Sequence, residues 1–121
     1  MSRVAGFLKL KVNGVLKQGK GEFEYNLGQP KRTPVLNADG TVAGFKEEAQ
    51  APFIKGKITD ASDFDVVELL NLVDATATLD LANGKTFVLQ EAFYSGEGTI
   101  NTGESEIEYE MTGTRAEEIL P

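Results

Sequence analysis

The chain has 121 residues, a formal net charge of −7 at pH 7, and neither cysteine nor histidine. A chain of this length forms one domain with its own hydrophobic core, and without cysteine that core contains no disulfide bonds. The missing residue types exclude Cys/His zinc sites, Ser-His and Cys-His nucleophiles, and a histidine acid-base group, which removes most familiar enzyme mechanisms.

The sequence contains no signal for a membrane or an export route. No apolar run approaches the roughly 18 residues of a membrane-spanning helix. Residues 1–6 are too short to hold the apolar region of a signal peptide. We therefore expect a soluble protein that is made in a cytoplasm and has no membrane partner.

The charge is divided unevenly along the chain. Residues 1–60 carry ten Lys and Arg against six Asp and Glu, and residues 61–121 carry two against thirteen, which gives net charges of +4 and −11. If the two halves occupy different faces, copies of the chain could associate head to tail through opposite charges. If strands from the two halves pair with each other, the charges interleave instead. The sequence leaves both arrangements open.

Two segments near the N-terminus have the alternation of half-buried strands. Apolar residues alternate with lysine over residues 7–12, and Asn13-Gly14 then supplies the two positive-φ residues of a type I′ turn into Val15. Residues 19–27 alternate again between apolar and mostly acidic side chains. The sequence therefore predicts a β-hairpin followed by a further strand.

A protruding arm is predicted over residues 28–52. Two prolines and the cations Lys31 and Arg32 interrupt the alternation between residues 28 and 34, which predicts a loop. Asn37 and Asp39 then belong to a turn between short extended segments. Residues 42–59 are predicted to be extended, with Pro52 favouring an edge strand or a bulge.

One helix is predicted, with Ser62 as its N-cap. Asp65 follows three residues later, as in an acidic form of the capping box, and Asp63 lies near the positive end of the helix dipole. The predicted apolar stripe, at positions i, i+3, i+4 and i+7, consists of Val66, Leu69, Leu70 and Val73. This stripe should cover one opening or edge of the sheet.

A second hairpin follows, formed by alternating residues 75–82, a turn at Asn83-Gly84, and residues 85–91. Glycines interrupt the chain before one more strand, and the tail after Gly113 is short and polar apart from Ile119 and Leu120. About seven or eight strands with one flanking helix predict a mainly β fold, a β-sandwich or partly closed barrel, as a single domain over residues 1–121.

The last predicted strand carries a row of carboxylates. Residues 104–111 alternate strictly, so one face can enter the core while the other is acidic. The acidic face consists of Glu104, Glu106, Glu108 and Glu110. Like charges about 7 Å apart repel each other, so this face must meet water or a partner that carries cations. It is either an ordinary solvated surface or a wall that must not adhere to a polyanion such as DNA.

No catalytic, cofactor or metal constellation stands out. The many carboxylates could in principle support glycoside hydrolysis, but no spacing selects a pair. Asp60, Asp63, Asp65 and Glu68 cluster as they would in a calcium loop, but the required sixth-position glycine is missing. Helix capping accounts for these residues better.

The order of segments closely resembles the tail tube proteins of Mu-like long-tailed bacteriophages, over roughly residues 4–113. The most specific parts are the hairpin NGKTFVLQEA at residues 83–92 and the segment GTINTGE at residues 98–104. Residues 32–35, 39–45 and 51–60 and the capped helix agree as well. The density of glutamate in the last strand departs from the family, whose members are more mixed there.

This resemblance implies a structural virion protein, not an enzyme, with no cofactor. It implies hexameric rings that stack into a tail tube, with the sheet edges closed in a continuous inner β-barrel. The implied partners are further copies of the chain and other tail proteins: baseplate, terminator, tape measure and, where one exists, sheath. Genomic DNA would pass through without specific binding during ejection. The implied location is the virion tail, after assembly in the host cytoplasm.

Within such a tube, two groups of residues become candidate sites. The four glutamates of the last strand become candidates for the lumen surface. The arm becomes a contact between subunits, with the candidate residues Lys31, Arg32, Asn37 and Asp39.

Two alternatives remain. The inner tube of a type VI secretion system or a phage-tail-like particle has the same general architecture. A small-ligand-binding β-barrel would need an apolar interior pocket, and usually tryptophan or spare aromatics at its mouth, whereas this chain has no tryptophan.

Overall fold

The computed structural model describes residues 8–17 and 19–121, and within them the chain forms eleven β-strands and one short α-helix. The strands are β1 (Leu8–Val12), β2 (Val15–Lys17), β3 (Gly19–Asn26), β4 (Lys31–Leu36), β5 (Val42–Glu48), β6 (Phe53–Thr59), β7 (Ala75–Leu81), β8 (Thr86–Tyr94), β9 (Ile100–Asn101), β10 (Glu106–Thr112) and β11 (Arg115–Ile119). The helix is α1 (Val66–Leu70). The predicted mainly β fold with one helix is confirmed.

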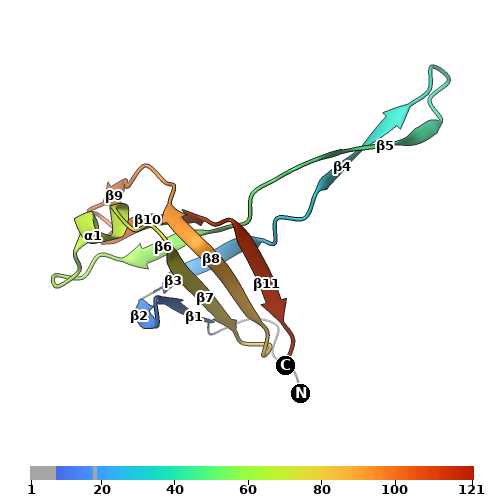
Figure 1. Ribbon diagram of the computed structural model, residues 1–121. Helices are drawn as coiled ribbons and strands as arrows, with labels where there is room; N and C mark the ends of the chain where they lie inside the picture. The colour runs from blue at the N-terminus through green and yellow to red at the C-terminus, as the bar shows by residue number, and fades with distance from the viewer. Residues whose placement is uncertain (1–7, 18) are drawn as a thin grey trace.

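Nine of the strands that the structure describes form one sheet that bends around the core (Figure 1). Its order is β2-β1-β7-β8-β10-β6-β3, with β11 paired to β8 and β9 paired to β10. β8 belongs to both layers of the resulting sandwich, because its first half pairs with β7 and β11 while Phe93 and Tyr94 pair with β10. Between the two halves Glu91 has a φ of 51° and the register slips, as expected for a bulge that redirects a strand.

Both predicted hairpins form, with different turns. Asn13 and Gly14 have φ values of 52° and 81°, which confirms the type I′ turn between β1 and β2. Between β7 and β8 the left-handed residue is Gly84, with φ of 93°. The Gly84 N–H donates to Leu81 O at 3.0 Å and the Leu81 N–H donates to Lys85 O at 2.9 Å, the pattern of a three-residue loop that ends in a glycine bulge.

The helix begins later than predicted. The Asp65 carboxylate accepts a 3.2 Å hydrogen bond from the Glu68 backbone N–H, so Asp65 is the N-cap and the prediction of Ser62 is wrong. The helix ends at Asn71, whose side-chain amide donates to Val67 O at 2.8 Å. At each end of the helix, a side chain therefore forms a hydrogen bond with the nearby backbone. These bonds favour ending the helix there over extending it.

The predicted apolar stripe is wrong at two of its positions. Leu69 is buried, but Leu70 and Val73 are 37% and 69% exposed. A helix of five residues cannot present positions seven residues apart on one face. Phe64 and Leu72, which flank α1, pack against the core instead. Among the described residues, no helix is long and apolar enough to cross a membrane.

The core lies between the two layers and has Tyr109 of β10 at its centre. The Tyr109 ring lies 6.1 Å from the Phe23 ring, centroid to centroid, and Phe23 in turn covers Gly56. Gly56 is the register partner of Tyr109, so the missing side chain leaves room for the Phe23 ring. The largest fully buried side chains are Tyr109, Phe87, Leu10, Ile54, Ile58, Leu79, Leu89, Ile107 and Met111.

Two segments are more regular than the sequence indicated. Residues 31–34 were predicted as loop, but they lie in β4, which pairs with β5 in a hairpin that extends away from the sheet (Figure 1). In a two-stranded ribbon every strand is an edge, so Pro34 is tolerated there. The tail forms β11, whose half-buried positions are Ala116 and Glu118. A glutamate at an inward position hides the alternation that would have predicted this strand.

Candidate assembly surfaces

The acidic strand predicted near the C-terminus is β10. Its alternation is confirmed from Glu106 onward, because the residues on the inner face, among them Tyr109, are fully buried. The strand begins two residues later than predicted, since Ser105 has a φ of 51° and interrupts the alternation. Glu104 therefore lies exposed in the preceding turn, where its backbone N–H donates a 3.1 Å hydrogen bond to the Asn101 side chain.

Lysines of the same chain face the glutamates of β10. Lys57 Nζ donates to Glu106 Oε1 at 3.0 Å, and Lys20 Nζ lies 3.5 Å from Glu106 Oε2. Lys55 Nζ lies 3.8 Å from Glu110 Oε1. Part of the positive charge that the acidic row needs is therefore supplied from β6 and β3, within the subunit.

Glu106 is the most enclosed carboxylate of this row, with a side chain that is 12% exposed. The hydrogen bond from Lys57, and next the positive charges of Lys57 and Lys20, lower the pKa of Glu106 below its ordinary value. Removing one partner would leave charge uncompensated in an enclosed place, which is costly. Glu106 therefore organises the contact between β10, β6 and β3.

Ion pairs and strand pairs join the basic and acidic halves of the chain. β6 of the first half pairs along its length with β10 of the second, and β1 pairs with β7. Lys11 of β1 lies 3.6 Å from Asp80 of β7. Of the two arrangements that the sequence left open, the structure has the interleaved one. Within the nine-stranded sheet the charges therefore do not separate into one basic and one acidic face.

The segment after β8 covers part of the acidic row, which the sequence did not indicate. Tyr94 Oη donates to the Glu108 carbonyl, and the Ser95 N–H donates to the Glu110 carbonyl at 2.9 Å. Burial, and next the Glu108 carboxylate, raises the pKa of Tyr94 to about 12. Glu108 and Glu110 are therefore half-buried rather than fully solvated.

The predicted arm residues lie on the β4–β5 hairpin, away from the acidic row. Arg32 Nε lies 3.3 Å from Glu47 Oε1, and the Arg32 guanidinium lies 4.6 Å from the centre of the Phe45 ring. Lys31 is exposed opposite Glu48. Arg32 therefore combines an ion pair with a cation–π contact on one face of the ribbon.

Asn37 and Asp39 close the tip of the arm. The Asp39 carboxylate accepts hydrogen bonds from the backbone N–H and hydroxyl of Thr41 at 3.0 and 2.6 Å, and these bonds lower the pKa of Asp39. The Asn37 side-chain amide donates to the Thr41 hydroxyl at 2.9 Å. Both side chains are thus used within the turn, in the manner of an Asx turn.

The arm also presents an apolar face that sequence analysis did not single out. Pro34 and Phe45 are paired across the ribbon, as are Leu36 and Val42. Leu36, Val42 and Phe45 are 61%, 68% and 56% exposed. Apolar side chains gathered on a projecting ribbon are typical of a surface that contacts another protein.

Comparison with known proteins agrees with this architecture. The family model for phage tail tube proteins matches residues 1–118. The fold is similar to the sheath/tube terminator of an extracellular contractile injection system, PVC, in its extended state, with a TM-score of 0.65 and 9% identity over 92% of this chain and 91% of that chain. It is also similar to the anti-feeding prophage cap, the AFP tube-terminating cap, with a TM-score of 0.64 and 10% identity over 94% of this chain and 88% of that chain. No curated protein sequence matches significantly.

At 9% and 10% identity the two structural neighbours establish a common fold only. The family model, in contrast, spans nearly the whole chain, from the first strand of the sandwich to β11. The chain therefore belongs to the phage tail tube protein family.

Proposed function

We propose that this protein is the structural subunit of a tail tube, in which copies form hexameric rings that stack into a conduit for genome ejection. The observation that carries the proposal is the β4–β5 ribbon, which pairs with no other strand among the described residues and exposes Leu36, Val42 and Phe45. An isolated two-stranded ribbon is marginally stable in water, so this arm gains stability by contacting another subunit.

The sheet edges support ring formation. β3 ends the strand order on one side, and within residues 8–17 and 19–121 β8 is the one strand that pairs with β11. Free edges invite pairing with another chain, and a closed ring of subunits satisfies them without open-ended aggregation. In the proposed tube, such pairing produces a continuous inner barrel.

We further propose that the outer face of β10, β6 and β3 lines the lumen. The carboxylates on this face are Glu22, Glu24, Glu106, Glu108 and Glu110, with Glu104 at its end beside Lys20, against the lysines Lys20, Lys55 and Lys57. The excess of carboxylates repels phosphates, while the lysines hold the carboxylates in place. Such a surface lets DNA pass without adhering to it.

The proposed partners are other copies of the chain and the remaining tail proteins, including the baseplate, terminator, tape measure and, where present, sheath. The proposed location is the virion tail after assembly in the host cytoplasm. The similarity to the two terminating proteins favours one second candidate, a subunit of a phage-tail-like injection particle. The role is structural in both cases, and neither requires a catalytic residue or a cofactor.

Size-exclusion chromatography and negative-stain electron microscopy of the purified protein test the proposal. We expect rings or tubes with a central channel. Hydrogen exchange adds a local measurement: amides of residues 30–45 should exchange rapidly in the free subunit and slowly in the assembly, because the arm is ordered by its neighbours. A protein that remains monomeric at high concentration, or an arm that is equally protected in both states, would contradict the proposal.

A further inference from the structure

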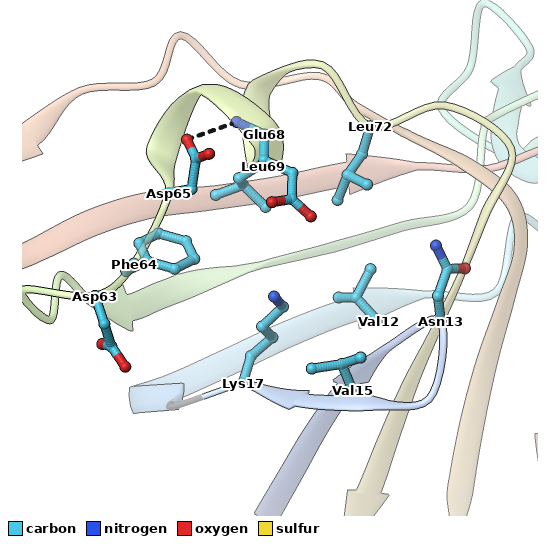
Figure 2. Close-up of a pocket in the computed structure, with 10 residues that line it drawn as sticks. All are labelled: Val12, Asn13, Val15, Lys17, Asp63, Phe64, Asp65, Glu68, Leu69 and Leu72. Atoms are coloured by element: carbon cyan, nitrogen blue, oxygen red, sulfur yellow. Dashed lines mark hydrogen bonds between the residues drawn. The ribbon is translucent and has the colours of Figure 1, made fainter.

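A pocket of about 240 Å³ lies between α1 and the β1–β2 hairpin (Figure 2). Its apolar floor includes Val12, Phe64 and Leu69. Val15, which also lines the pocket, is 57% exposed, so apolar surface continues to the mouth. The pocket is therefore partly apolar and open to solvent.

The rim of this pocket is acidic. Among the described residues that line it, Asp63, Asp65 and Glu68 are acidic and Lys17 is the one cation. Figure 2 shows the Glu68 carboxylate and the Lys17 ammonium pointing toward one another across the pocket. Asp65 is occupied by helix capping, whereas Asp63 and Glu68 are exposed. The pocket thus suits a group that combines apolar surface with positive charge.

The arm carries a group of this kind. The exposed Phe45 ring lies beneath the Arg32 guanidinium, at 4.6 Å, and the apolar side chain of Leu36 continues the same face of the ribbon. Aromatic and arginine side chains are the residues that most often anchor protein interfaces in pockets. The arm and the pocket are therefore complementary first in hydrophobicity. Arg32 Nε also lies 3.3 Å from Glu47, so in the docked arm the Arg32 guanidinium would share its charge between Glu47 and the acidic rim.

The arm of a given subunit does not reach its own pocket. Figure 1 shows the β4–β5 hairpin extending from one side of the molecule, with α1 on the opposite side. Any arm that enters the pocket must therefore belong to a second copy. An interface that joins two different patches is heterologous, and repeating it generates a ring or a filament.

We propose that the arm of one copy docks into the α1 pocket of the next, with the Phe45 ring on the apolar floor and the Arg32 guanidinium toward Asp63 and Glu68. This inference rests on the proposed tube function and names the receptor for the arm. It assigns an assembly role to the α1 region, where Val67 and Val73 are 66% and 69% exposed.

Disulfide cross-linking tests this pairing directly, because the chain has no cysteine of its own. Leu36→Cys on the arm is combined in one chain with Val15→Cys at the pocket. The matched control combines Leu36→Cys with Ile119→Cys, since Ile119 is comparably exposed at 49% but lies on β11. Mild oxidation of assembled protein should give a ladder of linked multimers for the Val15 pair, and little or none for the Ile119 pair.

Charge reversal provides an independent measurement. Arg32→Glu should raise the concentration needed for assembly on the order of tenfold, and so should Glu68→Lys. Combining the two in one chain should restore assembly, because each altered surface then meets an altered partner. Lys46→Glu is the control, with the same change of charge on the opposite face of the arm.

The possible outcomes distinguish a failure of the pocket assignment from a failure of the proposed tube function. Tubes that form without a Val15 ladder, or Arg32→Glu defects that Glu68→Lys does not repair, overturn the pocket assignment while the proposed function stands. Equal ladders from the Val15 and Ile119 pairs overturn it as well. Wild-type protein that forms neither rings nor tubes overturns both proposals.

Discussion

The Tyr25 hydroxyl donates a 2.9 Å hydrogen bond to the Glu118 carboxylate, and this bond joins the outermost strand of one layer, β3, to β11 of the other. The Tyr25 ring also stacks on Phe87, with centroids 4.4 Å apart. Lys85 Nζ lies 3.2 Å from Glu118 Oε1 and completes the contact. These interactions close the open side of the sandwich without backbone pairing between the two strands.

Tyr25→Phe should lower the melting temperature, because it removes the hydrogen bond to Glu118 but keeps the ring against Phe87. Glu117→Gln is the matched control, since Glu117 is the exposed neighbour on the other face of β11. Thermal unfolding followed by circular dichroism measures both variants. Equal melting temperatures for wild type and Tyr25→Phe would show that the hydrogen bond does not hold the layers together.

The enclosed carboxylates predict a loss of stability in acid. The hydrogen bonds from Tyr25 and Lys85 lower the pKa of Glu118, as Lys57 and Lys20 lower that of Glu106, both from an ordinary value of 4.5. Because the folded state holds these groups ionised, their contribution is present above about pH 4.5 and is lost as the pH falls through the lowered pKa values.

Melting temperatures of wild type and Glu106→Gln, measured from pH 7 down to pH 3, test this dependence. The wild type should be the more stable at pH 7, and the difference should shrink as the pH falls from about 4.5 through the lowered pKa of Glu106, where the folded carboxylate becomes protonated. A difference that stays constant over the whole range would mean that Glu106 stabilises the fold by packing rather than by its charge.

Gly56→Ala should destabilise the fold by about 1–3 kcal/mol, because the core there is already filled. A Cβ at Gly56 would lie 2.4 Å from the Phe23 ring, so the ring would have to shift and its packing against Tyr109 would be disturbed. Gly44→Ala in β5 is the control, since a Cβ at that position meets no atom within 4 Å. Chemical denaturation gives the unfolding free energies of both variants. Equal effects of the two substitutions would contradict the packing argument.

Leu69→Ala should cost about 2–5 kcal/mol of unfolding free energy through the cavity that it leaves. Leu70→Ala should cost clearly less, because Leu69 is 2% exposed and Leu70 is 37% exposed. The predicted stripe placed both leucines in the interior and so would have given them similar losses. Chemical denaturation measures the unfolding free energy of both variants. A larger loss of unfolding free energy for Leu70→Ala than for Leu69→Ala would contradict the observed burial of these two residues.

Local chemistry explains which parts of the fold could be predicted. The Asn13-Gly14 turn and the alternation of β10 depend on neighbouring residues. The predicted turn is correct, and the predicted alternation is correct from Glu106 onward. The strand β11 and the Asp65 cap were missed, because an inward glutamate and a competing Ser62 signal obscure the local pattern. The lysine partners of Glu106 depend on the pairing of β6 with β10, and Lys57 is 49 residues away in the chain. No local pattern specifies a contact of that kind.

The proposed lumen surface predicts that its charge controls the speed of ejection. The test uses Glu22 and Glu24, which are exposed on the same outer face, because reversing Glu106 would place a third cation beside Lys20 and Lys57. Glu22→Lys with Glu24→Lys should leave tails assembled but slow the release of DNA, since a cationic wall binds the passing phosphates at many points.

The slowing should ease as the salt concentration rises, because counterions screen contacts beyond about 8–10 Å at 0.1–0.15 M. Glu22→Gln with Glu24→Gln should slow release less, since these substitutions remove the repulsion of the phosphates without adding an attraction to them. Glu117→Lys, on the outer face of β11, is the control for a change of charge elsewhere on the subunit. DNA release from assembled particles, followed by fluorescence of a DNA-binding dye, measures the rate. Equal slowing by the β3 pair and by Glu117→Lys would place the acidic face outside the lumen, and its carboxylates would then serve only to hold Lys55 and Lys57 on the sheet surface.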